Sequence, residues 1–329
     1  MVKHKNKPKL ISKVTHKEIK PIDTDGKYMQ DANFQIIPIA KGLKNGEVQC
    51  KPKRLPKCPK HMPQLPLLIG GIGIVRAGKT NAFVNMTKEY QAYGSVNRVY
   101  IISPTYDSNA SLQTIKVRKE DVYRDSKTCI QALQHILSKI QQDADEYEME
   151  QEYKKIYKKW KKLGFIKLDF SEMEVITREN YRKPEDIPWP QPLIFIDDMT
   201  HTPLMANSIN NELSHLCLHH RHFANVGITI LQALQTFKQG MPKVVRHNLG
   251  AILLFETMNM KELKDIWEET ASSISFETFK QIFFEATKED HSFLFINRMA
   301  KDKNKQFGIS FDKVFNIDLL KEKQKILKI

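Results

Sequence analysis

The stretch that decides the fold is residues 65–81, L-P-L-L-I-G-G-I-G-I-V-R-A-G-K-T-N. An apolar run is followed by glycines, and residues 73–80 fit the pattern G-x-x-x-x-G-K-[ST]. Apolar residues then continue with helix-like spacing over residues 82–86. A strand, a glycine-rich turn and the start of a helix are the context that a phosphate-binding loop requires, because the backbone N–H groups and the helix dipole converge on phosphate. The stretch therefore predicts a nucleotide site.

Each part of this loop has an expected role. Gly73 and Gly78 allow positive φ and a close backbone approach to the ligand. Lys79 is expected to reach the β- and γ-phosphates of ATP, and the Thr80 hydroxyl to ligate Mg²⁺. The other predicted nucleotide contacts are Ile74, Val75, Arg76, Ala77 and Asn81. Residues 74–76 are bulkier than usual in such loops, but the flanking pattern disfavours the alternative of a chance match in an ordinary turn.

A second decisive element is residues 193–198, L-I-F-I-D-D. Four apolar residues that end in paired carboxylates predict a buried parallel strand with acids at its carboxyl edge, where ligands bind in open α/β sheets. Asp197 is expected to hold Mg²⁺ through water, and Asp198 to orient or deprotonate the attacking water. The alternative is a strand that ends in acidic cap residues for the next helix.

Two further polar residues follow predicted strands. Gln235 comes directly after the apolar run 226–234 and could contact the γ-phosphate and report hydrolysis, or be an ordinary loop glutamine. Arg246 lies beyond a proline turn, in M-P-K-V-V-R-H-N, just before the apolar run 249–255. It could complete the site of a neighbouring subunit, or equally be a structural ion-pair partner, and its position alone does not decide.

The remaining pattern predicts an α/β fold with a mainly parallel sheet flanked by helices. A lysine-rich and largely irregular N-terminal arm covers residues 1–60, an ATPase domain residues 61–320, and a basic tail residues 321–329. A charged helical insertion at about 127–165 interrupts the domain; its basic, aromatic part could contact DNA or be a solvated helix. Further strands are expected at residues 98–104, 292–297 and 306–311, and helices at 81–91, 127–142, 207–222, 260–270 and 275–287.

Composition limits the classes of protein. The 329 residues carry a formal charge of +14, and residues 1–60 alone hold fifteen Lys/Arg against five Asp/Glu, a net of +10. A polyanionic partner is therefore a reasonable expectation. The four scattered cysteines are typical of a reducing compartment. No apolar run approaches the ~18 residues of a membrane span, and the N-terminus lacks a hydrophobic signal core, which argues against secretion.

Two patterns of histidine and cysteine are candidates for metal sites. His215 and His219 share a helical spacing of four, but no third ligand is evident, so surface or packed histidines are the preferred interpretation. Cys50, Cys58 and His61 lack a second ligand pair with zinc-site spacing. Neither pattern predicts a metal centre.

Taken in order, these motifs resemble those of the viral genome-packaging ATPases of the FtsK–HerA superfamily. The resemblance covers roughly residues 65–316 and rests on G-I-V-R-A-G-K-T-N, V-Y-I-I-S-P-T, P-L-I-F-I-D-D-M, R-H-F-A-N-V-G-I-T-I, L-Q-T-F, M-P-K-V-V-R-H-N and S-F-E-T-F-K-Q-I-F-F-E-A-T. It implies a P-loop NTPase of RecA/ASCE-like type. It also implies an oligomeric ring that hydrolyses ATP and pumps double-stranded DNA into a preformed capsid, in contact with capsid or portal vertex proteins.

The resemblance assigns roles residue by residue. It assigns Lys79 and Thr80 to binding nucleotide and Mg²⁺, and Asp197 to binding the metal. It makes Asp198 the catalytic acidic residue and Gln235 the sensor of the γ-phosphate. Arg246, or another arginine such as Arg221, becomes a candidate finger acting on a neighbouring subunit. One departure is that the catalytic acid is Asp where the superfamily typically has Glu. The expected location is the host-cell cytoplasm or viral factory, with possible association with the virion.

Two other classes remain as alternatives. A small-molecule or nucleoside kinase would share the phosphate loop, but it would turn over ATP without stimulation by DNA, and no arginine-rich lid is evident. A non-enzymatic DNA-binding virion protein would have a degenerate nucleotide site, whereas Lys79, Thr80, Asp197 and Asp198 are all intact.

Overall fold

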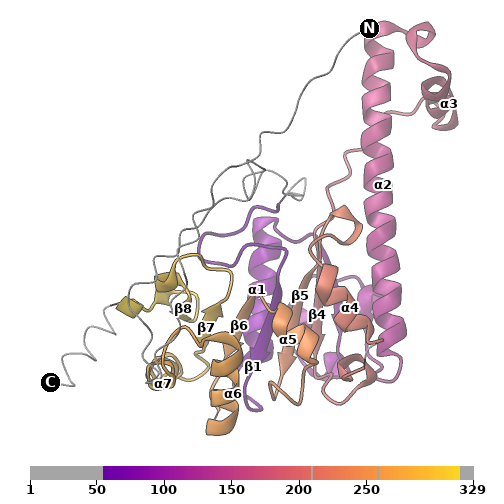
Figure 1. Cartoon of the computed structure of the whole chain (residues 1–329). Helices are drawn as coiled ribbons and strands as arrows, with labels where there is room; N and C mark the ends of the chain where they lie inside the picture. Colours follow the sequence, from indigo (N-terminus) through magenta and orange to yellow (C-terminus); the bar gives the residue numbers. More distant parts are fainter. Residues whose placement is uncertain (1–54, 209, 258, 319–329) are drawn as a thin grey trace, which may run out of the picture. The chain divides into compact units, whose positions relative to one another are not determined.

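A single nine-stranded sheet with helices on both faces organises the chain (Figure 1). The computed structural model describes residues 55–208, 210–257 and 259–318. The strands are β1 Leu68–Ile72, β2 Arg98–Ile102, β3 Val122–Tyr123, β4 Pro192–Asp197, β5 Thr229–Leu234, β6 Ala251–Leu254, β7 Leu294–Asn297, β8 Phe307–Ile309 and β9 Lys313–Val314. The helices are α1 Lys79–Tyr93, α2 Cys129–Leu163, α3 Phe170–Arg178, α4 Glu212–His219, α5 Lys243–Asn248, α6 Met260–Thr270 and α7 Phe276–Ala286.

The sheet order is β3-β2-β4-β5-β1-β6-β7-β8-β9. The first six strands in this order are parallel, and β7, β8 and β9 add antiparallel pairs at one side. Strand β5 lies between the phosphate-loop strand β1 and the acidic strand β4. This order confirms the α/β fold with a mainly parallel sheet, of the P-loop NTPase type, that was expected from the sequence. The carboxyl ends of β1, β2, β4, β5 and β6 share one edge, where ligands bind in such sheets.

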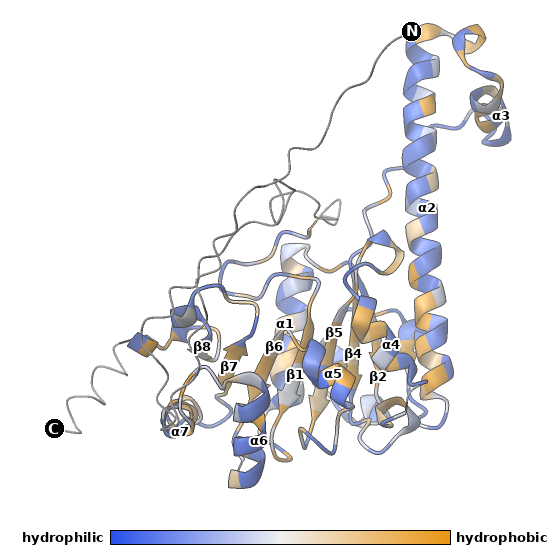
Figure 2. Cartoon of the chain, in the orientation of Figure 1, coloured by the Kyte–Doolittle hydropathy of each residue, from blue (hydrophilic) through white to orange (hydrophobic). Residues whose placement is uncertain are grey.

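Alternate residues of the strands feed two separate cores. In β4, Ile194 and Ile196 pack on one face with α2, α4, α6 and α7, while Leu193 and Phe195 pack on the other face with α1. The side-chain period of two along a strand explains this division. Because both faces are covered, the central parallel strands are mostly apolar, as their hydrophobic colouring shows (Figure 2), with buried Gln232 of β5 as a polar exception.

The phosphate-loop strand approaches its own helix closely because it presents a glycine to a ring of that helix. A Cβ at Gly71 would lie 2.7 Å from the ring of Phe83, a buried residue of α1. The absence of a side chain therefore allows α1 to pack tightly on β1 and sets the direction in which the loop between them opens.

The helical insertion differs from the expectation in extent. The apolar segment 127–142 and the charged segment 143–162 form one continuous helix, α2, and a second helix, α3, follows it. The sequence signal for α3 was present, since Asp169 and Glu172 form a reciprocal capping box at its start. Within the described residues, no helix combines the length and the apolar character needed to cross a membrane.

The chain termini lie largely outside the described residues. Of the predicted N-terminal arm only residues 55–60 are described, and the predicted tail 321–329 is not described. Pro56 and Pro59 are buried, and the Ser95 hydroxyl donates to the Lys57 carbonyl. Residues 56–60, which form no helix or strand, therefore contact the domain that follows them, and the extent of the arm stays a prediction.

Candidate nucleotide site

The phosphate loop connects β1 to α1 in the expected way. Gly78 has φ 100°, in the left-handed region that disfavours other residues, and directly precedes α1. The Lys79 amine donates to the carbonyls of Gly73 and Ile74, at 2.8 and 2.7 Å. Burial lowers the pKa of Lys79, while the charges of Asp197 and Asp198 act against this shift. The amine therefore faces the inside of the loop, where phosphates would lie.

Strand β4 brings its buried carboxylate to the loop. The Thr80 hydroxyl lies 3.1 and 3.2 Å from the two carboxylate oxygens of Asp197 and donates to them. Burial, with the neighbouring charge of Asp198, raises the pKa of Asp197 to about 7. A carboxylate whose charge is this poorly compensated favours a cation.

The pair formed by Thr80 and Asp197 fits Mg²⁺. One hydroxyl and one carboxylate oxygen are hard donors, and Mg²⁺ is usually held by one or two carboxylates together with substrate phosphates and water. The Thr80 and Asp197 oxygens already lie within hydrogen-bond distance of each other. Within the described residues no group of three or more His, Cys, Asp or Glu side chains could hold a metal alone, so this site needs phosphate oxygens as well.

Asp198 lies beside Asp197 but in a different environment. It is exposed, has φ 52°, and its Oδ2 accepts a hydrogen bond from the Thr105 hydroxyl at 3.0 Å. Thr105 follows β2 and is itself 3.1 Å from the hydroxyl of buried Ser103. The S-P-T turn after β2 thus holds the Asp198 side chain. This contact was missed from the sequence, although polar residues directly after an apolar strand are a usable signal.

A cavity of about 320 Å³ opens between these elements. Its lining includes Lys79, Thr80, Asp198 and Gln235, together with the loop residues Val75, Arg76, Gly78 and Asn81. The predicted residues from β1, β4 and β5 therefore converge. His291 also lines the cavity, and its ring lies about 3.3 Å from the position of a Cβ at Gly78. His291 was missed because it precedes an antiparallel strand, which the sequence could not place at this edge.

The segment after Gln235 is held by helix α6. The Phe237 backbone N–H donates to Glu262 at 2.8 Å, and Lys238 donates to Asp265 at 2.7 Å. Burial raises the pKa of Glu262, and hydrogen bonds from the Phe237 N–H and the Thr257 hydroxyl act against this shift. Glu262 therefore fixes the backbone two residues beyond Gln235.

Arg246 lies in a buried ion pair. Its side chain is 8 % exposed, and its guanidinium donates to Glu269 at 3.0 and 3.2 Å and to the Met241 carbonyl at 2.7 Å. Helix α5, which carries it, ends just before β6 begins, at the sheet edge opposite the nucleotide cavity. These contacts favour the structural interpretation of Arg246, and its role as a finger stays a prediction.

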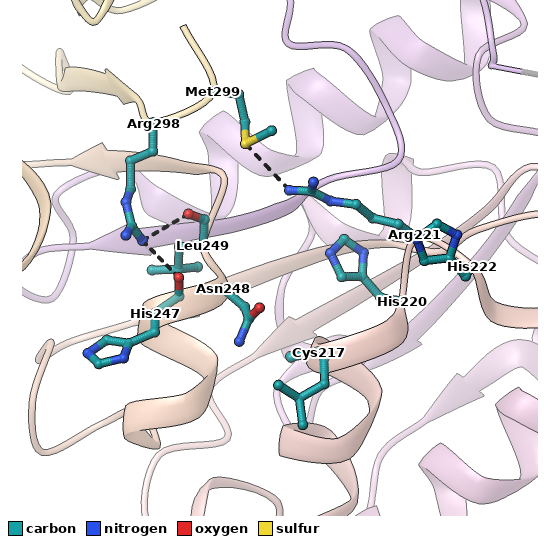
Figure 3. A pocket seen from close by; sticks show the side chains of 10 residues that line it. Cys217, His220, Arg221, His222, His247, Asn248, Leu249, Arg298 and Met299 are labelled. Atoms are coloured by element: carbon teal, nitrogen blue, oxygen red, sulfur yellow. Dashed lines mark hydrogen bonds between the residues drawn. The ribbon is translucent and has the colours of Figure 1, made fainter. Parts of the chain in front are cut away.

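Arg221 lies in a different setting, a basic cavity of about 340 Å³ (Figure 3). Its guanidinium contacts the Met299 sulfur at 3.4 Å, whereas Arg298 donates to the Leu249 carbonyl at 2.9 Å. The lining residues include Arg221, Arg298, His220, His222 and His247, and none of them is acidic. Burial lowers the pKa of His220 to about 4, so that imidazole is neutral. The guanidinium groups of Arg221 and Arg298 leave this surface positive.

In the part of the chain that the structure describes, the histidines and cysteines of the two candidate patterns belong to no group of three or more possible metal ligands. His215 and His219 are exposed on α4, as the surface interpretation requires. Cys50 lies outside the described residues, and the Cys58 thiol contacts the Pro56 carbonyl at 3.7 Å. His61 pairs with Glu89 at 2.6 Å.

Comparisons with known proteins give structural neighbours only. No protein-family model and no curated protein matches the chain by sequence. The genome packaging NTPase B204 from Sulfolobus turreted icosahedral virus 2, in complex with ATP-gammaS, shares 15 % identity over 70 % of this chain and 92 % of its own, with a TM-score of 0.38. The pCW3 conjugation coupling protein TcpA, with ATPgS, shares 12 % identity over 80 % and 64 %, with a TM-score of 0.40.

A third neighbour is EssC (ATPases 2 and 3) from Geobacillus thermodenitrificans, with 16 % identity over 78 % of this chain and 42 % of its own and a TM-score of 0.37. At such identities and TM-scores, the functional assignment depends on the residues of the site itself.

Proposed function

We propose that this chain is an ATPase that translocates double-stranded DNA and packages a viral genome into a capsid. The observation that carries the ATPase part is the convergence of Lys79, Thr80, Asp197, Asp198 and Gln235 at one sheet edge, around a single cavity. Phosphoryl transfer needs positioning and charge neutralisation more than covalent chemistry, and these residue types supply both.

The chain's residues divide the work of hydrolysis. The Lys79 amine exchanges its loop carbonyls for phosphate oxygens and neutralises charge on the triphosphate. Thr80 and Asp197 hold Mg²⁺, which, when bound, neutralises charge that develops on the phosphates. Asp198, oriented by the Thr105 hydroxyl, accepts a hydrogen bond or a proton from the attacking water. Gln235 contacts the γ-phosphate, so hydrolysis changes what the segment after β5 can contact.

The ring part of the proposal needs a cation from a neighbouring subunit. With Arg246 committed to Glu269, Arg221 is the better candidate, because it lies in a basic cavity lined by no carboxylate. An arginine supplied from outside the subunit stabilises the charge of the transition state, and the neighbour's γ-phosphate is the group that it would meet.

The DNA and capsid parts are supported by the ordered motifs and by charge. The net charge of +14 favours a polyanion, and contacts to phosphates suit movement along any sequence. The motifs resemble those of packaging ATPases from large DNA viruses, which places such an enzyme in the host-cell cytoplasm or viral factory, beside the portal or capsid vertex.

The test is the ATPase rate of the purified protein with and without double-stranded DNA. A translocase hydrolyses ATP faster with DNA, and Lys79→Ala is expected to reduce the rate at least about a hundredfold while leaving DNA binding intact. A Lys79→Arg variant serves as the charge-matched control, because it keeps the cation and loses the ammonium geometry. Undiminished hydrolysis in Lys79→Ala would refute the proposal. An ATPase rate that does not change when DNA is added would instead favour a kinase.

A further inference from the structure

Helices α2 and α3 build a helical hairpin, residues 145–183, with a small core of its own. Tyr153 and Ile156 of α2 are buried against Leu168 and Ile176. Buried Glu150 accepts hydrogen bonds from the Arg182 guanidinium at 3.1 and 2.6 Å and from the Glu185 backbone at 2.6 Å. A hairpin that is tied together in this way presents its outer side chains in fixed positions.

The connection between the two helices forms an exposed basic and apolar surface, the basic turn, made by residues 161–168 together with Phe170. Ile166 is 89 % exposed and Phe170 84 %, although both are large apolar side chains. Lys161, Lys162 and Lys167 are exposed around them and form no ion pair with any carboxylate of the described residues. Exposed apolar groups within a charged rim mark an interaction surface.

A second surface of opposite charge lies on the same hairpin. A groove of about 1290 Å³ runs along α2 and is bounded by α3 and by Trp189. We name it the acidic groove; among its carboxylates Glu172 is paired with Lys159 and Asp169 caps α3, which leaves Asp145, Glu148 and Glu152 against the one lysine of the lining, Lys155. Its apolar lining includes Met149, which is 62 % exposed, and Trp189. The groove thus offers negative charge for the lysines of the basic turn and apolar contacts for its exposed Ile166 and Phe170 side chains.

We propose that the basic turn of one subunit docks into the acidic groove of the next copy of this chain. The exposure of Ile166 and Phe170 shows that the turn does not dock in its own groove, and the hairpin core fixes both surfaces in place. Because the two surfaces are different patches of one chain, the contact is heterologous, and repeated contacts of this kind build a ring when the rotation between neighbouring copies closes. The inference rests on the ring of the proposed function and names the contact that builds it.

A second copy accounts for the turn better than DNA does. Phosphates would pair with Lys161, Lys162 and Lys167 but would leave Ile166 and Phe170 in water. The acidic groove, in turn, would repel DNA. A second copy of this chain carries both acidic and apolar groups in its groove, so one partner pairs with the lysines of the turn and also covers Ile166 and Phe170.

The test is a charge swap, read out as assembly. Full-length protein is studied with ATPγS by sedimentation velocity across a range of concentrations. Reversing the turn (Lys161→Glu with Lys162→Glu) or the groove (Glu148→Lys with Glu152→Lys) should each raise the concentration needed for assembly at least about tenfold. The four changes together, or a 1:1 mixture of the two double variants, should restore assembly. Lys116→Glu with Lys119→Glu is the matched control and should change nothing, since both lysines are exposed elsewhere.

Each outcome decides the inference. Unchanged assembly in both double variants overturns it, and so does failure of the fourfold variant to recover while its circular dichroism melt matches that of the wild type. If the Lys161→Glu, Lys162→Glu variant loses binding to DNA or anionic vesicles but assembles normally, the turn belongs to those partners. That result also overturns the inference. Failure of the proposed function is seen separately, as hydrolysis that survives Lys79→Ala, whatever the state of assembly.

Discussion

At the scale of single residues, the two neighbouring aspartates show how the backbone separates their chemistry. Asp197 is the last residue of β4 and is 1 % exposed, whereas Asp198 has left the strand with φ 52° and is exposed. The first can therefore be a metal ligand with an unfavourable charge of its own, and the second a hydrated acceptor. The pair I-D-D predicted both residues from the sequence, but not this difference in burial.

The raised pKa of Asp197 leads to a prediction about pH. An ordinary aspartate titrates near 4 and this one at about 7, so the folded protein binds the extra proton between these values and its unfolding free energy falls as pH rises from about 4 to about 7. The Asp197→Asn substitution removes this loss of unfolding free energy, because asparagine does not titrate. Without nucleotide, its unfolding free energy relative to wild type should rise by roughly 2–3 kcal/mol between pH 5 and pH 8, since one pKa unit corresponds to about 1.4 kcal/mol.

Thermal melts at the two pH values measure this effect. Asp312→Asn, at an exposed carboxylate, is the control and should show no such pH dependence. Adding Mg²⁺ and ATP at pH 8 should make the wild type more stable than Asp197→Asn, because the wild-type carboxylate then gains a cation and the asparagine does not. If the difference in melting temperature between Asp197→Asn and the wild type is the same at pH 5 and pH 8, burial does not raise the pKa of Asp197.

At the scale of secondary-structure elements, the link between β5 and α6 connects Gln235, the proposed γ-phosphate sensor, to the body of the fold. Glu262→Ala should remove the acceptor of the Phe237 N–H and release the backbone next to Gln235. We expect kcat for ATP hydrolysis to fall about tenfold, with nucleotide affinity changed less than about twofold, because the residue positions a group and does not touch the phosphates.

Two further variants make this test specific. Glu262→Gln keeps an amide oxygen for the Phe237 N–H and should recover most of the rate. Asp265→Ala breaks only the neighbouring pair with half-exposed Lys238 and should have a small effect, as surface pairs contribute about 0–1 kcal/mol. A Glu262→Ala enzyme with wild-type kcat would show that this contact does not position Gln235.

Elements with strong periodicity were predictable, and short or edge elements were not. The strand run 193–198 and helix α6 were expected almost at their observed limits, because their apolar patterns leave little choice. Strands β3 and β9 have two residues each, too few to show an alternation. The position of β5 between β1 and β4 depends on pairing across the sheet, which a single sequence does not encode locally.

The same reasoning applies to the site. Lys79, Thr80 and the aspartates follow from motifs in which spacing fixes chemistry. Thr105 and His291 come from separate strands, and only the sheet order brings them to the cavity. The sequence does not decide between two roles for Arg246, because a position before β6 does not show where the guanidinium points; the buried pair with Glu269 supplies that information.

At the scale of the whole molecule, charge is distributed unevenly along the chain. Residues 1–60 account for +10 of the net +14, so the remaining residues carry only about +4. Residues 1–54 lie outside the described residues, and the residues that line the candidate nucleotide cavity all lie beyond residue 55. A protein that starts at residue 55 therefore lacks the lysine-rich segment and keeps the lining of this cavity.

This separation gives a prediction about DNA affinity. If the lysine-rich segment binds phosphates, deleting residues 1–54 should lower the dependence of log K on log salt by about 0.9 for each phosphate that the segment neutralises, because fewer counterions are released from the DNA. Titrations of both proteins with duplex DNA at several salt concentrations measure the two slopes, and unchanged ATP affinity confirms that the truncated protein is folded. An equal slope for both proteins would exclude the segment from the DNA interface and assign DNA binding to the described domain.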